Sequence, residues 1–317
     1  MSRMRRFLSV AAVLMGAPAL ADVPNVAVDV APVHSLVARI MDGVGEPSLI
    51  VQPGASPHEY GLRPSEAAAL QDADLVFWIG EDLTPWMEDA IETLATGAAI
   101  TSLLEADGTT RLDVRDGALF EADDDADHGA PGDDDHDDPA GQQGEEHGAY
   151  DPHAWLSPRN AGLWLDIIAA RLSAADPDNA AAYSANAAAA RAELDALATE
   201  VTAILDPVRG SSFIVFHDAY QYFEVDFEFP ASGAISLGDA SEPGPARIAE
   251  IQARIRDGGI SCVLAEPQFN PGMAAAVLDG SGARTGVIDP LGAELDPGAA
   301  LYPQLIRNMA QTLADCL

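Results

Sequence analysis

LVFWI, at residues 75–79, is a strongly apolar run that reads as a β-strand. A helical segment at residues 85–94 follows it, with Trp86 and Ile91 as its expected packing residues. The same order, a strand and then a helix, recurs before and after this pair. Such alternation is typical of parallel βα units, so we expect LVFWI to be one strand of a parallel sheet.

The alternation extends through both halves of the chain. In the first half we expect further strands at residues 26–30, 49–51 and 98–101 and helices at 32–41, 63–70 and 158–174. In the second half we expect strands at 213–216, 262–265 and 285–288 and helices at 245–256, 271–278 and 299–313. The fold class that follows is α/β, with two αβ lobes built on parallel-type sheets.

A long helix is expected between the two lobes. Asp176 is placed to be its N-cap and Pro177 its first helical residue. The residues from there to about 205 contain no further glycine or proline, which predicts a helix of roughly 28 residues, about 42 Å long. We interpret residues 176–206 as a rigid connecting helix between an N-terminal lobe, 22–175, and a C-terminal lobe, 207–317.

Residues 121–149 interrupt the first lobe with an acidic insertion. It holds twelve Asp and Glu residues and three histidines, His128, His136 and His147, without a helix or strand period. Such a composition cannot bury enough apolar surface to order itself, so we expect a disordered insertion. Either it collects cations at low affinity near a tighter site, or it is a solvated acidic loop with incidental histidines. Composition alone favours neither.

The first 21 residues have the layout of a cleavable signal peptide. Arg3, Arg5 and Arg6 form a positive region, residues 7–15 form an apolar core, and residues 19–21 are an A-x-A cleavage site. No later apolar run is long enough to span a bilayer. We therefore expect an exported, soluble protein in the periplasm.

The charge balance is strongly acidic. Sixteen basic residues, all arginine, stand against 51 Asp and Glu, for a formal net charge of −35. A chain with this charge repels nucleic acid and anionic membrane surfaces and attracts cations. We therefore expect no nucleic-acid partner.

Cys262 and Cys316 are the two cysteines of the chain. In an oxidising compartment an even pair suggests a disulfide rather than two free buried thiols. Closing a loop of that length would stabilise the fold by about 4 kcal/mol in the chain-entropy model.

Potential metal ligands follow several of the expected strands. His58 lies in the loop after strand 49–51, His217 directly follows strand 213–216, and Asp289 directly follows strand 285–288. His153 lies on a constrained loop after Asp-Pro. Ligands of parallel αβ sheets bind outside the carboxyl ends of the strands, so two facing lobes would bring these side chains together. Three imidazoles and a carboxylate make a plausible tetrahedral zinc set.

Four stretches of the chain resemble the signature sequences of one family. They are GASPHEY at 54–60, DPHAWLSP at 151–158, FHDAY at 216–220 and EPQF at 266–269. They are similar to those of ZnuA-type proteins, the periplasmic zinc-binding components of high-affinity ABC importers. The resemblance covers nearly the whole mature chain. It implies two αβ lobes joined by a long helix that allows limited hinge motion, with the metal in the interlobe cleft.

The resemblance also implies roles for individual residues. His58, His153 and His217 match the family's histidine ligands, and Asp289 matches the carboxylate that some members use as fourth ligand. In other members a glutamate beside the first histidine, here Glu59, or a water completes the site. The cysteine pair matches a disulfide found in similar proteins. The charged insertion is a family trait too, although aspartate rather than histidine dominates it here.

Zn²⁺ is the expected ion. Manganese-binding relatives carry a glutamate where His217 stands, and imidazole favours zinc over the harder manganese ion. Glu266 could be a ligand, but its place before a proline at a strand end also suits an acceptor for a histidine N–H, which we favour. His34 could line the cleft or bind a second ion, but we favour a surface or capping role.

The leading functional hypothesis is a non-enzymatic periplasmic protein that captures Zn²⁺ and delivers it to an ABC permease in the inner membrane. We expect a monomer, with a periplasmic zinc chaperone as a further candidate partner. One alternative is a zinc-dependent hydrolase, against which stands the lack of an H-E-x-x-H or similar general-base motif. Another is a manganese-binding or adhesin-type relative.

Overall fold

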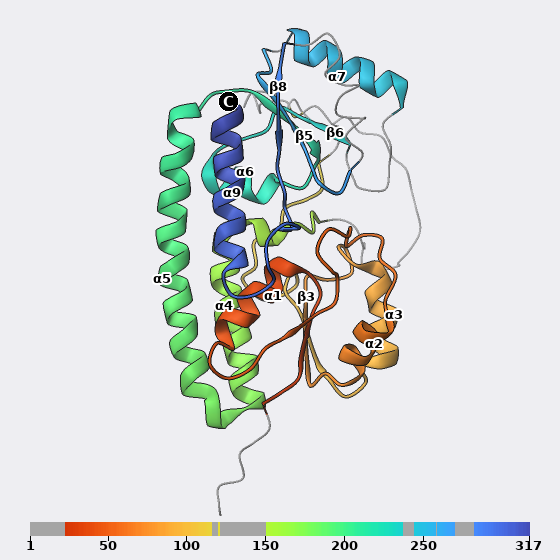
Figure 1. Cartoon of the computed structure of the whole chain (residues 1–317), viewed down its shortest axis with the longest axis vertical. Coiled ribbons are helices and arrows are strands. Elements are labelled where there is room, and N and C mark those ends of the chain that lie inside the picture. The colour runs from red at the N-terminus through yellow and green to blue at the C-terminus, as the bar shows by residue number, and fades with distance from the viewer. Residues whose placement is uncertain (1–22, 116–119, 121–149, 237–243, 258, 270–281) are drawn as a thin grey trace, which may run out of the picture.

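The computed structural model describes residues 23–115, 120, 150–236, 244–257, 259–269 and 282–317. The expected signal peptide, the acidic insertion with its three histidines and the helix expected at 271–278 lie outside the described residues. Within them the chain forms two αβ lobes, stacked along the long axis of the molecule (Figure 1). The α/β class with parallel sheets is confirmed.

The first lobe is built on a four-stranded parallel sheet in the order β2-β1-β3-β4. Its strands are β1 (Val26–Val28), β2 (Ser48–Leu49), β3 (Leu75–Trp78) and β4 (Ala99–Ser102). Its helices are α1 (Ala31–Ile40), α2 (Pro64–Gln71) and α3 (Pro85–Leu94). Alternate residues of β3 face opposite sides: Phe77 packs in the central core, whereas Val76 packs with α2 and α3.

The second lobe repeats this plan with the order β6-β5-β7-β8, again parallel. Its strands are β5 (Phe213–His217), β6 (Ala234–Ser236), β7 (Cys262–Ala265) and β8 (Arg284–Val287). Its helices are α6 (Gln221–Phe227), α7 (Pro245–Asp257) and α9 (Leu301–Cys316). The sequence analysis missed β6 and α6, which are the shortest strand and helix of this lobe. Each has too few residues to establish a period.

A long helix, α5 (Ala180–Leu205), runs along one side of both lobes, and α4 (Pro158–Ala175) lies beside its first half (Figure 1). Asp176 directly precedes the long helical stretch and Pro177 begins it, as expected, although the first turn, Pro177–Asn179, is a 3₁₀ turn that leads into α5 and the Asp176 side chain makes no N-cap hydrogen bond. The Asp176 carboxylate instead accepts hydrogen bonds from the Tyr183 hydroxyl at 2.9 Å and from the Asn179 amide at 2.7 Å, which joins the end of α4 to the start of α5.

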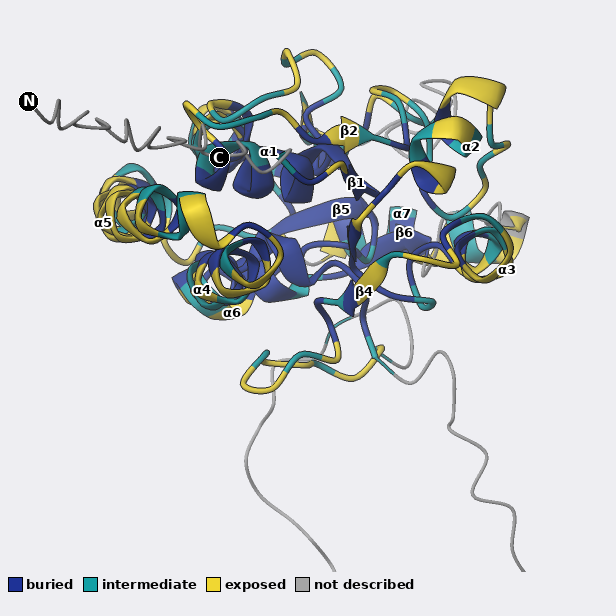
Figure 2. Ribbon diagram, turned by 90° about the horizontal axis from the view of Figure 1, so that it is seen from below, coloured by how far each residue is buried: buried dark blue, intermediate teal, exposed yellow. Residues whose placement is uncertain are grey.

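One apolar core continues through both lobes. It includes residues of β1, β3, β5 and β7 on the inner faces of the sheets and of α1, α4, α5 and α9, and Figure 2 shows buried segments concentrated between the outer helices. Hydrogen bonds cross between the lobes as well. The Trp155 indole donates to the Pro290 carbonyl at 2.8 Å, and the Tyr302 hydroxyl donates to the Trp155 carbonyl at 2.8 Å. This shared core limits how far the lobes can move apart.

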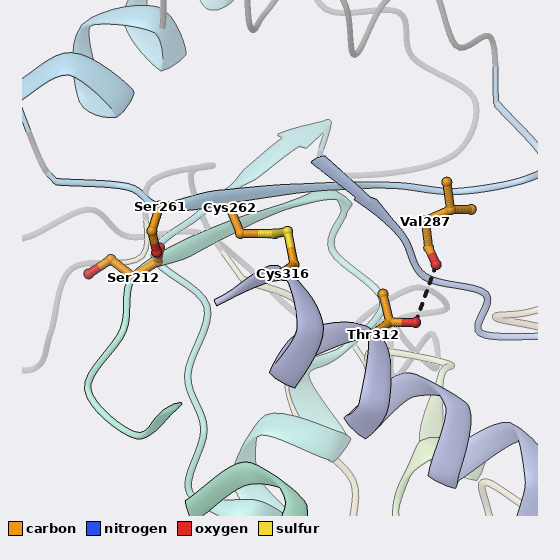
Figure 3. The surroundings of a disulfide bond; sticks show 6 residues. All are labelled: Ser212, Ser261, Cys262, Val287, Thr312 and Cys316. Carbon is orange, nitrogen blue, oxygen red and sulfur yellow. Dashed lines mark hydrogen bonds between the residues drawn. A yellow bond between two sulfur atoms is a disulfide. The ribbon is translucent and has the colours of Figure 1, made fainter. Parts of the chain in front are cut away.

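Cys262 of β7 and Cys316, the last residue of α9, form a disulfide with a Cα–Cα distance of 5.8 Å (Figure 3). The expected pairing is confirmed. Beside it, Gly286 of β8 allows α9 to pack closely, since a Cβ there would lie 3.3 Å from Thr312 Cγ2 and 3.5 Å from Cys316 Cβ, both of α9. No helix within the described residues is both long and apolar enough to cross a membrane.

Candidate metal centre

His58, His153 and His217 meet at one small cavity between the two lobes. His58 lies on the loop after β2, His153 precedes a 3₁₀ turn at Ala154–Leu156, and His217 is the last residue of β5. The cavity has a volume of about 10 Å³, which is room for a single water-sized occupant. The other residues that line it are Ser56, Pro57, Trp155, Glu266, Gln268, Phe269, Pro290 and Leu291.

A carboxylate holds the ring of each of the two inner histidines. Asp151 Oδ1 lies 2.7 Å from His153 Nδ1, and Glu266 Oε1 lies 2.7 Å from His217 Nδ1. All four side chains are at most 7% exposed. A carboxylate accepts a hydrogen bond, so each Nδ1 carries the proton and each Nε2 of a neutral ring carries a lone pair. Carboxylates commonly fix metal-binding histidines in this way.

The two Nε2 atoms face each other at 3.4 Å. Two imidazole nitrogens bound to one tetrahedral zinc ion at about 2.0–2.1 Å would lie roughly 3.3 Å apart. The observed spacing therefore fits two ligands of one small cation. A direct hydrogen bond between these atoms would require one ring to take up a second proton.

His58 is the outer member of the group. Its ring centroid lies 5.5 Å from that of His153, close to the 5.2 Å that separates the His153 and His217 rings. His58 is half-buried, whereas the other two are buried. Among the described residues no three His, Cys, Asp or Glu side chains already converge as a metal-binding group. The arrangement is a preformed pair of nitrogens with a third imidazole beside it.

Comparisons with known proteins extend the argument from the site to the whole chain. The sequence model of the family described as "Zinc-uptake complex component A periplasmic" matches residues 26–316. The chain belongs to this family, the ZnuA family. It is 45% identical over 308 residues to the high-affinity zinc uptake system protein ZnuA of Brucella abortus (strain 2308), covering 92% of this chain and 91% of that protein.

Two further ZnuA proteins show the same full-length similarity. The high-affinity zinc uptake system protein ZnuA of Paracoccus denitrificans (strain Pd 1222) is 42% identical over 305 residues, covering 95% of this chain and 94% of that protein. A crystal structure of ZnuA superposes with a TM-score of 0.73 at 25% identity, covering 93% of this chain and 99% of that one. The two-lobe arrangement is therefore that of the ZnuA family, whose described role is uptake rather than catalysis.

Asp289 is not part of the cavity lining, although Pro290 and Leu291, the two residues after it, are. Its Oδ1 accepts the backbone N–H groups of Leu291 and Gly292 at 3.0 and 2.9 Å, and its Oδ2 accepts that of Ala293 at 2.6 Å. These bonds shape the loop after β8, which places Pro290 and Leu291 against the cavity. A carboxylate oxygen has two lone pairs, so Oδ2 can accept this bond and still contact an ion.

The two glutamates considered from the sequence lie in different environments. Glu59 is exposed and does not line the cavity. Glu266 is buried, lines the cavity and makes the hydrogen bond to a histidine Nδ1 described above. The structure thus places Glu266 behind His217, on the side of the ring away from His153.

His34 is buried in α1, so the expectation of a surface position is wrong. Its Nε2 lies 3.0 Å from the Pro47 carbonyl oxygen, which joins α1 to the segment that leads into β2. Burial lowers the pKa of this imidazole, and the contact with Pro47 opposes that effect only partly. His34 does not line the metal cavity, and its observed contact is structural.

Asp151 is the residue of the site that the sequence analysis overlooked. Its position suggested only a turn before Pro152, yet its Oδ1 accepts both the backbone N–H of His153 at 2.9 Å and the ring Nδ1–H. The available signal was the spacing, because an Asp two residues before a His can accept that residue's backbone N–H in an Asx turn. The turn brings the carboxylate to the same side as the imidazole.

Proposed function

We propose that this chain binds one Zn²⁺ ion between its lobes, through His58, His153 and His217, and delivers it to an ABC permease. The observation that carries the proposal is the pair of Nε2 atoms 3.4 Å apart, each on a ring held by a carboxylate. One nitrogen comes from the first lobe and the other from the second. An ion bound by both would hold the lobes together, and rotation of the half-buried His58 side chain would add a third nitrogen.

Asp289 is the proposed fourth ligand, with Glu59 or a water as the alternatives. Asp289 follows the strand β8 next to the cavity, and its Oδ2 accepts one backbone hydrogen bond. Glu59 would have to turn inward from an exposed position. The four-coordinate set of three imidazoles and a carboxylate that results is a common one for zinc.

The chemistry of the donors supports zinc as the cargo. Neutral imidazoles are intermediate in softness and suit zinc, whereas manganese is better served by carboxylate and carbonyl oxygens. The strongly negative chain also attracts divalent cations to its surface. We propose that the acidic insertion at 121–149, with His128, His136 and His147, collects zinc at low affinity for the tight site.

The proposal includes export and partners. Residues 1–21 direct the chain to the periplasm and are removed there. The mature chain works as a monomer, receives zinc from solution or from a periplasmic zinc chaperone, and docks on the inner-membrane permease. A zinc hydrolase is disfavoured because the chain has no H-E-x-x-H or similar general-base motif.

A competition titration of the metal-free protein with a chromophoric zinc chelator tests this function. We expect one tight zinc site per chain and far weaker binding of manganese in the same assay. The proposal fails if zinc does not compete with the chelator, or if manganese binds more tightly than zinc. Chelator-sensitive hydrolysis of esters or peptides would favour the enzyme instead.

A further inference from the structure

Arg115 makes a buried contact between the lobes that the zinc site itself does not explain. It lies in the first lobe, and its guanidinium is paired with Asp218 and Glu224 of the second lobe. Its Nε and Nη2 donate to the two oxygens of Asp218 at 3.0 and 2.5 Å, and its Nη1 and Nη2 donate to those of Glu224 at 3.0 and 3.1 Å. The two carboxylate side chains are only 6% and 5% exposed.

Arg115 belongs to a short two-stranded segment from which the acidic insertion emerges. We call residues 111–115 and 150–151 the neck. Asp113 and Tyr150 form an antiparallel bridge across it, and the Asp151 N–H donates to the Leu112 carbonyl at 2.8 Å. The Arg111 guanidinium lies over the Tyr150 ring, 4.6 Å from its centroid. All of these contacts are made by residues outside the acidic insertion.

Tyr222 of α6 makes a second contact between the neck and the second lobe, in addition to the ion pairs of Arg115. The buried Tyr222 hydroxyl accepts the Leu112 N–H at 3.0 Å and donates to the Asp151 carbonyl at 2.8 Å. One hydroxyl of the second lobe therefore joins both sides of the neck. Arg115 adds two bidentate ion pairs. One is with Glu224 of the same helix, and the other is with Asp218, the residue after His217.

Both inner histidines are adjacent to this contact in sequence. Asp218 directly follows His217, and Asp151 precedes His153 by two residues and holds its ring. A shift of the neck relative to α6 would therefore change the distance between the two Nε2 atoms. Bidentate arginine–carboxylate pairs resist such a shift because two parallel hydrogen bonds fix both distance and orientation.

We propose that Arg115 is a positioning residue for the metal centre, which holds the His217 loop at its distance from His153 by fixing the neck to α6. This inference rests on the proposed zinc site, but it assigns a role to a side chain that does not line the cavity. It also means that the base of the acidic insertion and the metal centre share one set of contacts. Displacement of the neck loosens the site without removing a ligand.

Arg115→Gln removes the ion pairs, and Arg307→Gln is a matched control. Arg307 also makes a bidentate pair across two elements, from α9 to Glu200 of α5, at 2.7 and 2.9 Å. That pair is away from the neck and does not line the cavity. Tyr222→Phe is a milder second variant, because it removes the docking hydroxyl and keeps the ring.

Zinc affinity, measured by chelator competition on folded protein, and the visible absorption of bound Co²⁺ provide the two readouts. We expect Arg115→Gln to weaken zinc at least tenfold and to alter the Co²⁺ spectrum, which reports the ligand geometry. Tyr222→Phe should change both in the same direction by a smaller amount, about threefold in affinity. Arg307→Gln should leave both unchanged. A merely structural role would lower the melting temperature of Arg115→Gln and leave zinc affinity and the spectrum unchanged at 25 °C.

Wild-type zinc affinity and an unchanged Co²⁺ spectrum in folded Arg115→Gln would overturn the inference. If that variant does not fold, the same result in Tyr222→Phe overturns it. His153→Ala is included as a reference for loss of a ligand. If His153→Ala loses zinc while Arg115→Gln does not, only the role of Arg115 is wrong; if the wild type binds no zinc, the proposed function fails as well.

Discussion

His153 of the first lobe and His217 of the second present their Nε2 atoms to each other at 3.4 Å, with a carboxylate behind each ring. The rings meet edge to face, with an angle of 66° between their planes. Neither lobe alone could form this pair. An ion bound by both nitrogens would therefore respond to the relative placement of the lobes, which would couple its capture and release to that placement.

Replacing either inner histidine with alanine should weaken zinc binding at least a hundredfold, because each supplies one of two nitrogens already at ligand spacing. Competition titration measures the effect. His128→Ala, in the acidic insertion, is the matched control and should retain the tight site. Wild-type affinity in His153→Ala or His217→Ala would remove that residue from the ligand set.

Removing a carboxylate behind a ring should weaken zinc less than removing the ring. Glu266→Gln and Asp151→Asn each leave an acceptor oxygen but remove the negative charge that raises the basicity of the imidazole. Outer partners of metal-bound histidines are worth about 10–100-fold in affinity, so we expect losses near the lower end of that range. Glu193→Gln, which loses an exposed pair with Arg39, should have no effect. A loss as large as that of the histidine variants would indicate that the carboxylate itself binds the ion.

Asp289→Asn and Glu59→Gln together identify the fourth ligand. We expect Asp289→Asn to weaken zinc about tenfold or more, because it removes a charged oxygen next to the cavity, and Glu59→Gln to have no effect. Chelator competition gives the affinities, and thermal melting of the metal-free variants checks that the loop at 291–293 is intact. The reverse pattern would assign Glu59, and wild-type affinity in both would assign a water.

Deleting residues 121–149 should lower the total amount of bound zinc while the tightest dissociation constant stays nearly the same. The neck provides the reason, since the Asp113–Tyr150 bridge and the contacts of Arg115 and Tyr222 lie outside the deleted segment. Zinc stoichiometry by elemental analysis and affinity by titration separate the two effects. A large loss at the tight site would show that the insertion contributes to it directly.

Asp29 should give the metal-free protein a specific dependence of stability on pH. It is completely buried directly after β1, and this burial raises its pKa to about 7. The hydrogen bonds from the Ile79 and Val30 N–H groups, at 2.6 and 2.7 Å, lower the pKa but do not offset the effect of burial. A raised pKa means that the folded state holds the proton more tightly than the unfolded state. The stabilisation is therefore present in full below the ordinary pKa of Asp and is lost as the pH rises through about 7.

Urea unfolding of the wild type and Asp29→Asn at pH 5 and pH 8 tests this dependence. The asparagine does not titrate and places an N–H₂ donor against one of the two backbone donors, so the variant should be less stable at both values. The difference between the two proteins should shrink by about 3 kcal/mol from pH 5 to pH 8, while all other titrating groups cancel. A constant difference would contradict the raised pKa.

Local sequence signals predicted the regular parts of the fold well. The apolar run around Phe77 and the strand that ends at His217 are long enough for their type and ends to be recognised, and both are buried parallel strands in the structure. The start of the long helix at Pro177 was predicted correctly, but its first turn is 3₁₀, and the hydrogen bond from the Tyr183 hydroxyl to Asp176 was not foreseen. That hydrogen bond spans seven residues across the turn between α4 and α5, and it depends on packing rather than on a helix or strand period.

The site could be predicted only in part for the same reason. Strand ends and the family resemblance pointed to the three histidines, and the structure brings their rings to one cavity. The sequence favoured Glu266 as an acceptor for a histidine N–H, and it accepts that of His217, but which histidine it serves, 49 positions away, and the pairing of Arg115 with Asp218, 103 positions away, were not predicted. No periodicity or spacing encodes such contacts, because they depend on how the two lobes pack.

Anomalous diffraction at the zinc absorption edge, on crystals of the zinc-bound protein, tests the central claim most directly. We predict one strong peak in the cavity between the lobes, about 2.0–2.1 Å from a ring nitrogen of each of His58, His153 and His217. A peak bound elsewhere, or the three imidazoles directed to separate places with no shared ion, would contradict the account.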